Sequence, residues 1–239
     1  MSTPQIPWLR VLVEGAVIVG SILLALTADA WWDGVTERAL ERDALDRLSA
    51  EFSEVDSVLA NWQANHQSVV DAAEVLLRHA GPDPVPLAPD SIGVLLWTTL
   101  VAWTFDPPAT TLPSLQSSGR LDLIRSQELH SELARWQSLL DDLRGDEENL
   151  LSYTYRTIQP WIVSHVAQRS LSYYSGDSLY AGTQSRFPDG LVAVLADRDF
   201  EGHVDMRRTE TNNILANYSA LRAQVARLKA IIDAQLRSR

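Results

Sequence analysis

The stretch from Trp8 to Trp32, WLRVLVEGAVIVGSILLALTADAWW, decides the architecture of this chain. Residues 11–28 are almost wholly apolar, and Glu14 is the only charged residue among them. An apolar run of this length is typical of a membrane-spanning helix. Trp8 and Trp31 would lie about 35 Å apart along such a helix, which is the hydrocarbon core plus a little interface. Because tryptophan prefers that interface, we predict that Trp8, Trp31 and Trp32 are interface anchors.

A cleaved signal peptide is the alternative interpretation of the same stretch. The triplet Ala28-Asp29-Ala30 fits the small-x-small cleavage pattern, which would release a chain that begins at Trp31. The region before it has a single arginine, Arg10, and the apolar run is interrupted by Glu14. A signal peptide has a positive start and an uninterrupted apolar run, so we favour a retained anchor.

The few charges before the span set the predicted orientation. Arg10 and the amino terminus are the positive charges on that side, and positive charge tends to stay in the cytoplasm. We therefore expect a cytoplasmic N-terminus at residues 1–10, a membrane helix at residues 11–32, and an exported domain at residues 33–239.

Within the span, five residues form a candidate packing site for another membrane helix. Ala16 and Gly20, and likewise Ser21 and Ala25, are small-xxx-small pairs that allow close helix approach, although small residues are also common in such helices. Glu14 is costly at its depth unless it reaches the headgroups or bonds to a neighbouring helix. Both interpretations of each feature remain open from the sequence.

Composition excludes several classes of protein. The chain has 239 residues and a formal net charge of −11, which argues against binding to nucleic acid or to an anionic lipid surface. It contains no cysteine, so disulfides, thiolate chemistry and cysteine metal sites are excluded. About 200 residues outside the span are enough for one well-packed domain.

Apolar residues at alternating spacings of three and four predict three long helices outside the span. They cover residues 35–79 (joined to the span), residues from Ser126 to beyond Leu143, and residues 199–236. Strand-like alternation is short everywhere. The predicted fold class is all-α: one N-terminal transmembrane helix continuing into an antiparallel bundle of about four long helices plus short ones. The seam residues are Leu45, Leu48, Phe52, Val55, Leu59, Trp62, His66, Val69, Ala73 and Leu76; Leu129, Leu133, Trp136, Leu140 and Leu143; and Thr211, Ile214, Tyr218, Leu221, Val225, Leu228 and Ile232.

Shorter signals predict the ends of helices. Asp90 or Ser91 is expected to cap a helix that continues through Trp103, and Ser126 is expected to cap the next long helix. Gly119 suits a left-handed helix end. The segment 145–148, GDEE, predicts a kink.

His66 occupies a seam position in the first long helix. It could contact a ligand, act as a pH-sensitive group, or be a core histidine with a hydrogen-bond partner, and the last is the ordinary case.

The segment from residue 170 to 190 is polar and carries four aromatic residues. We interpret it as a long surface excursion, which is unusual in compact domains and often functional, although a plain insertion is the alternative. Its aromatic residues are predicted partner contacts: Tyr173, Tyr174, Tyr180 and Phe187.

Two blocks carry a resemblance to a known group of proteins. They are EGAVIVGSILLALTADAWWD (14–33), followed by an acidic heptad helix, and LPSLQSSGRLDLIRSQEL (112–129); a Tyr-x-x-Leu step at Tyr218 and Leu221 adds to them. The chain resembles an uncharacterised family of bacterial single-span membrane proteins. The resemblance implies an inner-membrane anchor with a periplasmic helical domain, and it supplies no reaction, cofactor or catalytic residue.

Signatures of catalysis and of cofactor binding are missing from the sequence. It has no glycine-rich phosphate loop, no G-x-S-x-G and no H-E-x-x-H. His130 and Glu132 could touch a metal, but a solvated helix face is the ordinary explanation. The span holds no histidine to ligate haem or chlorophyll magnesium. We therefore expect no catalytic residue, no cofactor site and no metal site.

The sequence favours a non-catalytic accessory subunit that packs its span into a larger membrane complex and braces it. Its expected partners are integral membrane protein subunits and the bilayer, with no nucleic acid and no small-molecule ligand. We expect the complex to be an energy-transducing one, such as a photosynthetic reaction-centre–antenna complex or a respiratory complex. The alternative is a periplasmic four-helix ligand-sensing module, although only about ten residues precede the span, too few for an output domain there.

Overall fold

The computed structural model describes residues 8–175 and 182–238, and the regular structure in these ranges is entirely helical, as predicted. The long helices are α1 (Trp8–His79), α4 (Gln127–Tyr153) and α7 (Arg198–Arg237). The shorter elements are α2 (Pro89–Leu100), α3 (Thr111–Ser117), η1 (Arg120–Leu123), η2 (Thr154–Ile158), α5 (Gln159–His165), α6 (Gln168–Tyr174) and η3 (Ala193–Ala196).

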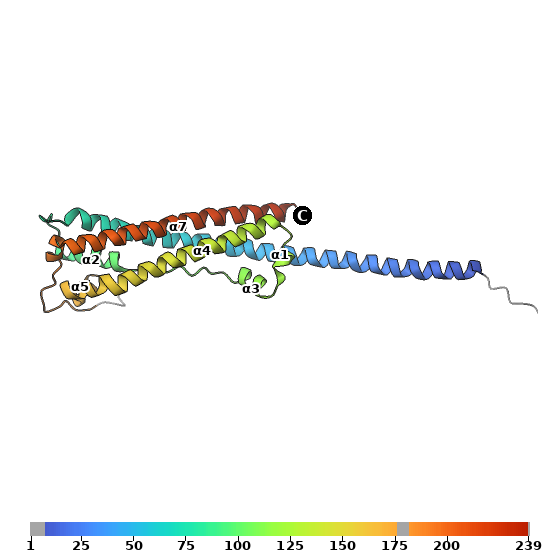
Figure 1. The fold of residues 1–239 in the computed structure, drawn as a ribbon, viewed down its shortest axis with the longest axis horizontal. Coiled ribbons are helices and arrows are strands. Elements are labelled where there is room, and N and C mark those ends of the chain that lie inside the picture. Colours follow the sequence, from blue (N-terminus) through green and yellow to red (C-terminus); the bar gives the residue numbers. More distant parts are fainter. Residues whose placement is uncertain (1–7, 176–181, 239) are drawn as a thin grey trace, which may run out of the picture.

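Helix α1 is 72 residues long and passes through Gly34 without a break. Its first half projects beyond the rest of the molecule, as Figure 1 shows, and its described side chains between Leu12 and Leu40 are exposed apart from the half-buried Gly34. Among the described residues it is the one helix long and apolar enough to cross a membrane. Its most apolar window has a mean hydropathy of 1.6 and is 0% buried. The predicted continuity of span and first bundle helix is confirmed.

The second half of α1 lies beside α7, and α7 lies beside α4 (Figure 1). Asp56 of α1 pairs with Arg222 of α7 at 3.2 Å, and further along α1 the ring of His66 packs on Tyr218. Between α4 and α7, Asp146 accepts a hydrogen bond from Asn217, and Glu132 accepts one from Gln224.

The predicted heptad seams form the core of this bundle. Two hydrophobic clusters divide the core. One comprises residues from 45–59 of α1, 129–150 of α4 and 214–232 of α7, and the other lies at the end formed by α2, α5 and α6. All the seam residues are buried except Trp62, which is half-buried. Burying such side chains is the main stabilising contribution that the sequence offers.

Two of the predicted helix ends are confirmed. The Ser126 hydroxyl accepts a hydrogen bond from the amide of Leu129 at 3.1 Å, which caps α4. Gly119 follows α3 with φ +66°, in the left-handed region that glycine adopts without a Cβ clash.

Other predicted ends are wrong. Helix α2 begins at Pro89, after Ala88, because proline is pre-organised for the first helical position and needs no amide partner there. It ends at Leu100 rather than Trp103. Helix α4 continues through residues 145–148 without interruption, and the irregular turn is the π-helix η2 immediately after it.

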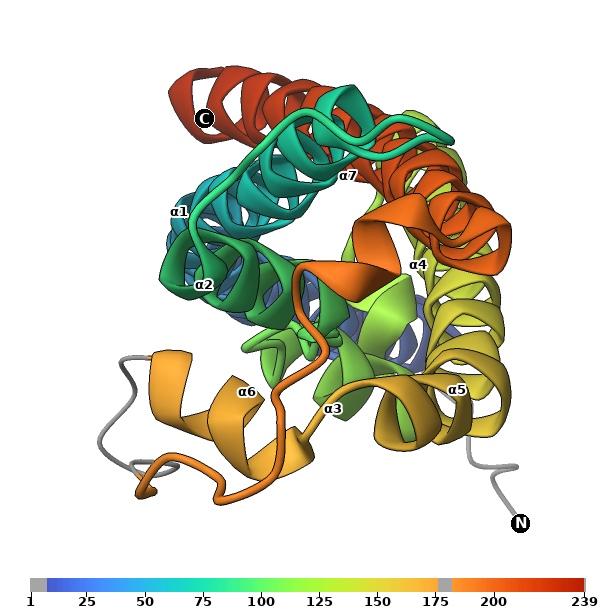
Figure 2. The same ribbon diagram turned by 90° about the vertical axis from the view of Figure 1, so that its left-hand side faces the viewer.

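The segment from residue 170 to 190 is only partly the excursion that its polarity suggested. Helix α6 covers its beginning, because Leu171 is fully buried and Tyr174 packs directly over Gly93 of α2. Figure 2 shows α6 beside α2 at this end of the molecule. Residues 182–190 are non-helical and return to the turn after α5, where the amide of Ala167 bonds to the carbonyl of Asp189 at 2.9 Å.

Candidate functional site

The most distinctive part of the bundle is the non-helical segment 101–110 between α2 and α3, which we call the strap (Figure 1). It carries Pro107 and Pro108, which favour extended backbone and remove two amide donors. A non-helical segment packed on a helical core must satisfy its backbone polar groups with side chains. Four charged residues on the long helices do this for the strap and for the chain that continues from it.

Arg207 of α7 holds the start of the strap. Its guanidinium is 1% exposed and donates to the carbonyls of Thr99 and Val101, both at 2.8 Å, and to the hydroxyl of Thr154 at 3.3 Å. The two carbonyls lie at the C-terminal end of α2, where backbone acceptors lack helical partners and positive charge is favourable. Burial lowers the pKa of Arg207 to about 10, so the side chain remains a cation at neutral pH. Arg207 thus satisfies backbone carbonyls at the end of α2.

Glu147 of α4 holds the middle of the strap. Both carboxylate oxygens lie 3.1 Å from the amide nitrogen of Phe105, which donates to them, and Oε1 also accepts from the Tyr218 hydroxyl at 3.2 Å. Burial raises the pKa of Glu147, and the two hydrogen bonds oppose that shift. The site therefore couples strap, α4 and α7 through a single carboxylate.

Two glutamates of α1 hold the end of the strap and the chain beyond it. Glu51 accepts from the amides of Thr110 and Thr111, at 2.9 and 2.6 Å, where α3 begins. Glu41 accepts from the amide of Arg125 at 2.9 Å and forms an ion pair with its side chain at 3.8 Å. The helices of the bundle therefore fix the whole connection from α2 to α4 at intervals.

Sequence reasoning missed these anchors although a signal was present. Glu41, Glu147 and Arg207 fall on the heptad seams, one step from Leu45, from Leu143 and Leu150, and from Val204 and Thr211 respectively. A charged residue at a seam position is costly to bury unless it has specific partners, so its presence in the seam indicates a buried polar contact. Their partners lie 42 to 108 residues away for Glu147 and Arg207, which no local pattern predicts.

His66 lies beneath the strap. It is 1% exposed, its ring centroid is 5.2 Å from that of Tyr218, and the Trp103 ring of the strap meets it edge-on at 5.8 Å. Its Nε2 atom is buried and has no hydrogen-bond partner among the described residues. Burial, and secondarily the charge of Arg207, lower the pKa of His66 to about 4. The expectation that His66 is a buried core histidine is confirmed. The expected hydrogen-bond partner is not present at Nε2 among the described residues.

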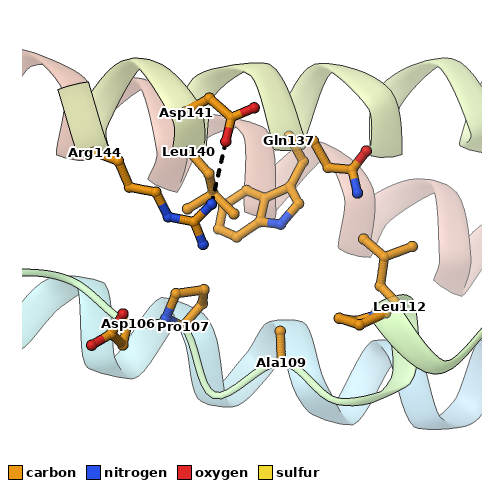
Figure 3. A pocket seen from close by; sticks show the side chains of 10 residues that line it. Asp106, Pro107, Ala109, Leu112, Gln137, Leu140, Asp141 and Arg144 are labelled. Carbon is orange, nitrogen blue, oxygen red and sulfur yellow. Dashed lines mark hydrogen bonds and ion pairs between the residues drawn. The ribbon is translucent and has the colours of Figure 1, made fainter. Parts of the chain in front are cut away.

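A cleft of about 440 Å³ separates the strap from α4. In Figure 3 the strap supplies one wall, and Arg144 of α4 points into the space between them while paired to Asp141 at 3.2 Å. Its floor is apolar and its rim is polar, which is a common arrangement for small ligands. The lining residues are Asp106, Pro107, Ala109, Leu112, Pro113, Trp136, Gln137, Leu140, Asp141 and Arg144.

The predicted packing residues of the span are all surface residues of α1. Glu14, Ala16, Gly20, Ser21 and Ala25 are exposed, and a Cβ on Gly20 would meet nothing within 4 Å. The anchors Trp31 and Trp32 are 67% and 65% exposed, and the side chain of Trp8 lies outside the described part of the chain. The apolar part of α1 is thus exposed along its described length.

The four aromatic residues of the 170–190 segment are not brought together. Phe187 is 80% exposed and Tyr173 is 49% exposed, whereas Tyr174 packs on Gly93. Tyr180 lies outside the described residues.

The pair of His130 and Glu132 does not form a site either: His130 bonds to the carbonyl of Ile124 and Glu132 to Gln224. Within residues 8–175 and 182–238, no group of three or more possible metal ligands comes together.

Comparison with known proteins gave no match: no family model, no curated protein and no solved structure resembles this chain at a significant level.

Proposed function

We propose that this chain is a non-catalytic, membrane-anchored accessory subunit that packs its span into a larger membrane complex and stabilises it. The observation that carries the proposal is the continuity of α1, which supplies both the exposed apolar stretch and the central seam of the bundle. A protein that needs only a tether can use a flexible linker, whereas this chain has a helix in its place.

The continuous helix would fix the height and the orientation of the bundle. From Trp32, at the predicted interface, to Glu41, the first buried residue, α1 rises by about 14 Å at ~1.5 Å per residue. The bundle would therefore stand a short, defined distance from the bilayer. Such geometry suits a part that braces neighbouring subunits, because a rigid lever transmits the packing of the span to the domain.

The finer arrangement belongs to the same proposal. We infer a bacterial inner-membrane protein with residues 1–10 in the cytoplasm and an antiparallel helical bundle in the periplasm, in line with the positive charge before the span. Its partners would be integral membrane subunits that contact α1 through Glu14, Ala16, Gly20, Ser21 and Ala25. An energy-transducing assembly, photosynthetic or respiratory, is the host we propose.

Replacing residues 11–30 with an all-leucine helix of equal length tests the proposal. Insertion into the membrane should persist, and recovery of the partner subunits after gentle detergent extraction should be lost. Gly20→Leu should weaken recovery by steric obstruction, and Glu14→Gln keeps the shape while removing the charge. Equal recovery from the native and all-leucine spans, at matched expression, would reduce α1 to a tether.

A periplasmic ligand-binding module is the second candidate, and the cleft between the strap and α4 is the observation in its favour. A module acting through this cleft needs the span only as a tether. The all-leucine replacement therefore separates the two functions, since it would leave such a module with its partners.

A further inference from the structure

The strap packs against a buried histidine whose surroundings disfavour the protonated form. His66 of α1 is covered by Tyr218, which is fully buried, and by Trp62 and Trp103, which are half-buried. Trp103 belongs to the strap, and its ring contacts both His66 and Trp62, at 5.8 and 6.1 Å. The strap therefore forms part of the cover over His66.

The surroundings of His66 oppose a positive charge. From α7 it faces Arg207, a buried cation, and Tyr218, whose hydroxyl already donates to Glu147 of α4. From the strap it faces the uncharged Trp103. With Nε2 lacking a partner among the described residues, an imidazolium here would need either water or a carboxylate that the closed site does not provide.

We propose that His66 makes the strap an acid-released latch: protonation of its imidazole expels the Trp103 ring and lifts residues 101–106 off the bundle. The latch is independent of the proposed function, because it follows from the contacts of the strap alone.

Release at Trp103 would spread to the neighbouring anchors. An imidazolium repels Arg207, the side chain that binds the carbonyls of Thr99 and Val101 at the start of the strap. Lifting the strap also removes one wall of the 440 Å³ cleft, since Asp106 and Pro107 line it (Figure 3). The same event would therefore loosen the segment and open the cleft.

Glu147 acts in the opposite direction. Because burial raises its pKa, the closed strap binds a proton at Glu147 more tightly than an open strap would. Acid therefore favours closure through Glu147 and opening through His66. The two groups can be told apart by substitution.

The size of the effect follows from linkage. His66 titrates near 6.5 when hydrated and near 4 in the closed site. Through His66 alone, the ratio of open to closed strap should then rise about twentyfold between pH 7 and pH 5.

Amide hydrogen exchange of the full chain in lipid nanodiscs measures this ratio, after correction for the intrinsic pH dependence of exchange. Protection of the hydrogen-bonded amides of Val101 and Phe105 should fall by up to about twentyfold at pH 5, while α7 residues 214–228 keep theirs. His66→Phe retains a ring without the charge and should abolish the fall. His66→Gln, neutral at both pH values, should do the same and decides the matter if the phenylalanine variant does not fold.

His79→Phe is the control: it removes a histidine from the same helix, outside the contacts of the strap, and should leave the fall intact. The latch is wrong if the wild-type strap keeps its protection at pH 5, if His66→Gln loses protection as the wild type does, or if the loss extends equally into α7.

Discussion

Single residues of this chain have two structural roles that are not evident from its composition. Three charged residues are buried in the core: Glu41, Glu147 and Arg207. Their side chains form hydrogen bonds with backbone groups of the strap and of the chain next to it. Leaving those backbone groups unpaired in the core would cost about 1–3 kcal/mol each, so the charged side chains are part of the fold. Glycines have the second role, by admitting backbone where a side chain would not fit.

Gly190 is the sharpest case at this scale. It has φ +75°, and a Cβ there would overlap the carbonyl oxygen of His165. Gly190→Ala should therefore lower the free energy of unfolding by more than ~2 kcal/mol, through backbone strain and a clash that neither chain segment can relieve. Chemical denaturation followed by circular dichroism measures the loss.

Gly145→Ala is the matched control. Gly145 is inside α4, and nothing lies within 4 Å of its Cβ position. Because alanine is the better helix former, this variant should be more stable by about 0.5–1 kcal/mol. If both alanine variants unfold like the parent, the return of residues 189–190 to the end of α5 does not contribute to stability.

At the scale of elements, the long helices were predictable and their connections were not. Leu45, Leu140 and Leu221 belong to seams whose spacing alone predicts a buried helix face. The end of α2 is different, because the apolar pattern continues to Trp103 whereas the helix ends at Leu100. There Arg207 binds the carbonyls of Thr99 and Val101, which are 108 and 106 residues away from it in the sequence. The anchors and the cleft depend on such distant contacts, so the sequence indicated a helical bundle and missed its strap.

The seams themselves make a direct prediction. Leu59→Ala in α1 and Leu221→Ala in α7 each remove a side chain that is 0% exposed. Each should destabilise the bundle by about 2–5 kcal/mol, from lost burial and the cavity that remains. The melting temperature measures both.

Val94→Ala, at a site on α2 that is 47% exposed, is the comparison and should change stability by less than about 0.5 kcal/mol. Unchanged melting for both leucine variants would mean that the seams are not the core.

At the scale of the whole molecule, the length of α1 determines how far the apolar stretch extends from the bundle. At ~1.5 Å per residue it is about 108 Å long, and the part before Glu41 accounts for about 50 Å of that. The apolar stretch is long enough to cross a bilayer, and the remaining turns separate it from the bundle. Any rotation of the span about its axis is therefore a rotation of the strap and of the cleft around the same axis.

Insertions between Asp33 and Gly34 test whether that coupling matters. Seven helical residues would raise the bundle by about 10 Å and turn it by only about −20°, because each residue adds about 100°. Nine would raise it by about 14 Å and turn it by about 180°, toward the opposite side. If partners bind one particular face of the bundle, the chain with seven added residues should co-purify with far more partner protein from native membranes than the chain with nine.

A seven-residue Gly-Ser insertion at the same place separates rigidity from length, because it adds the same number of residues without holding an angle. It should fall between the two helical insertions, since a flexible joint lets the bundle find its partner at an entropic cost. Recovery equal to that of the unmodified chain for all three insertions would show that the bundle works at any height and angle. The continuity of α1 would then be a consequence of helix propagation alone, and the span could be treated separately from the domain.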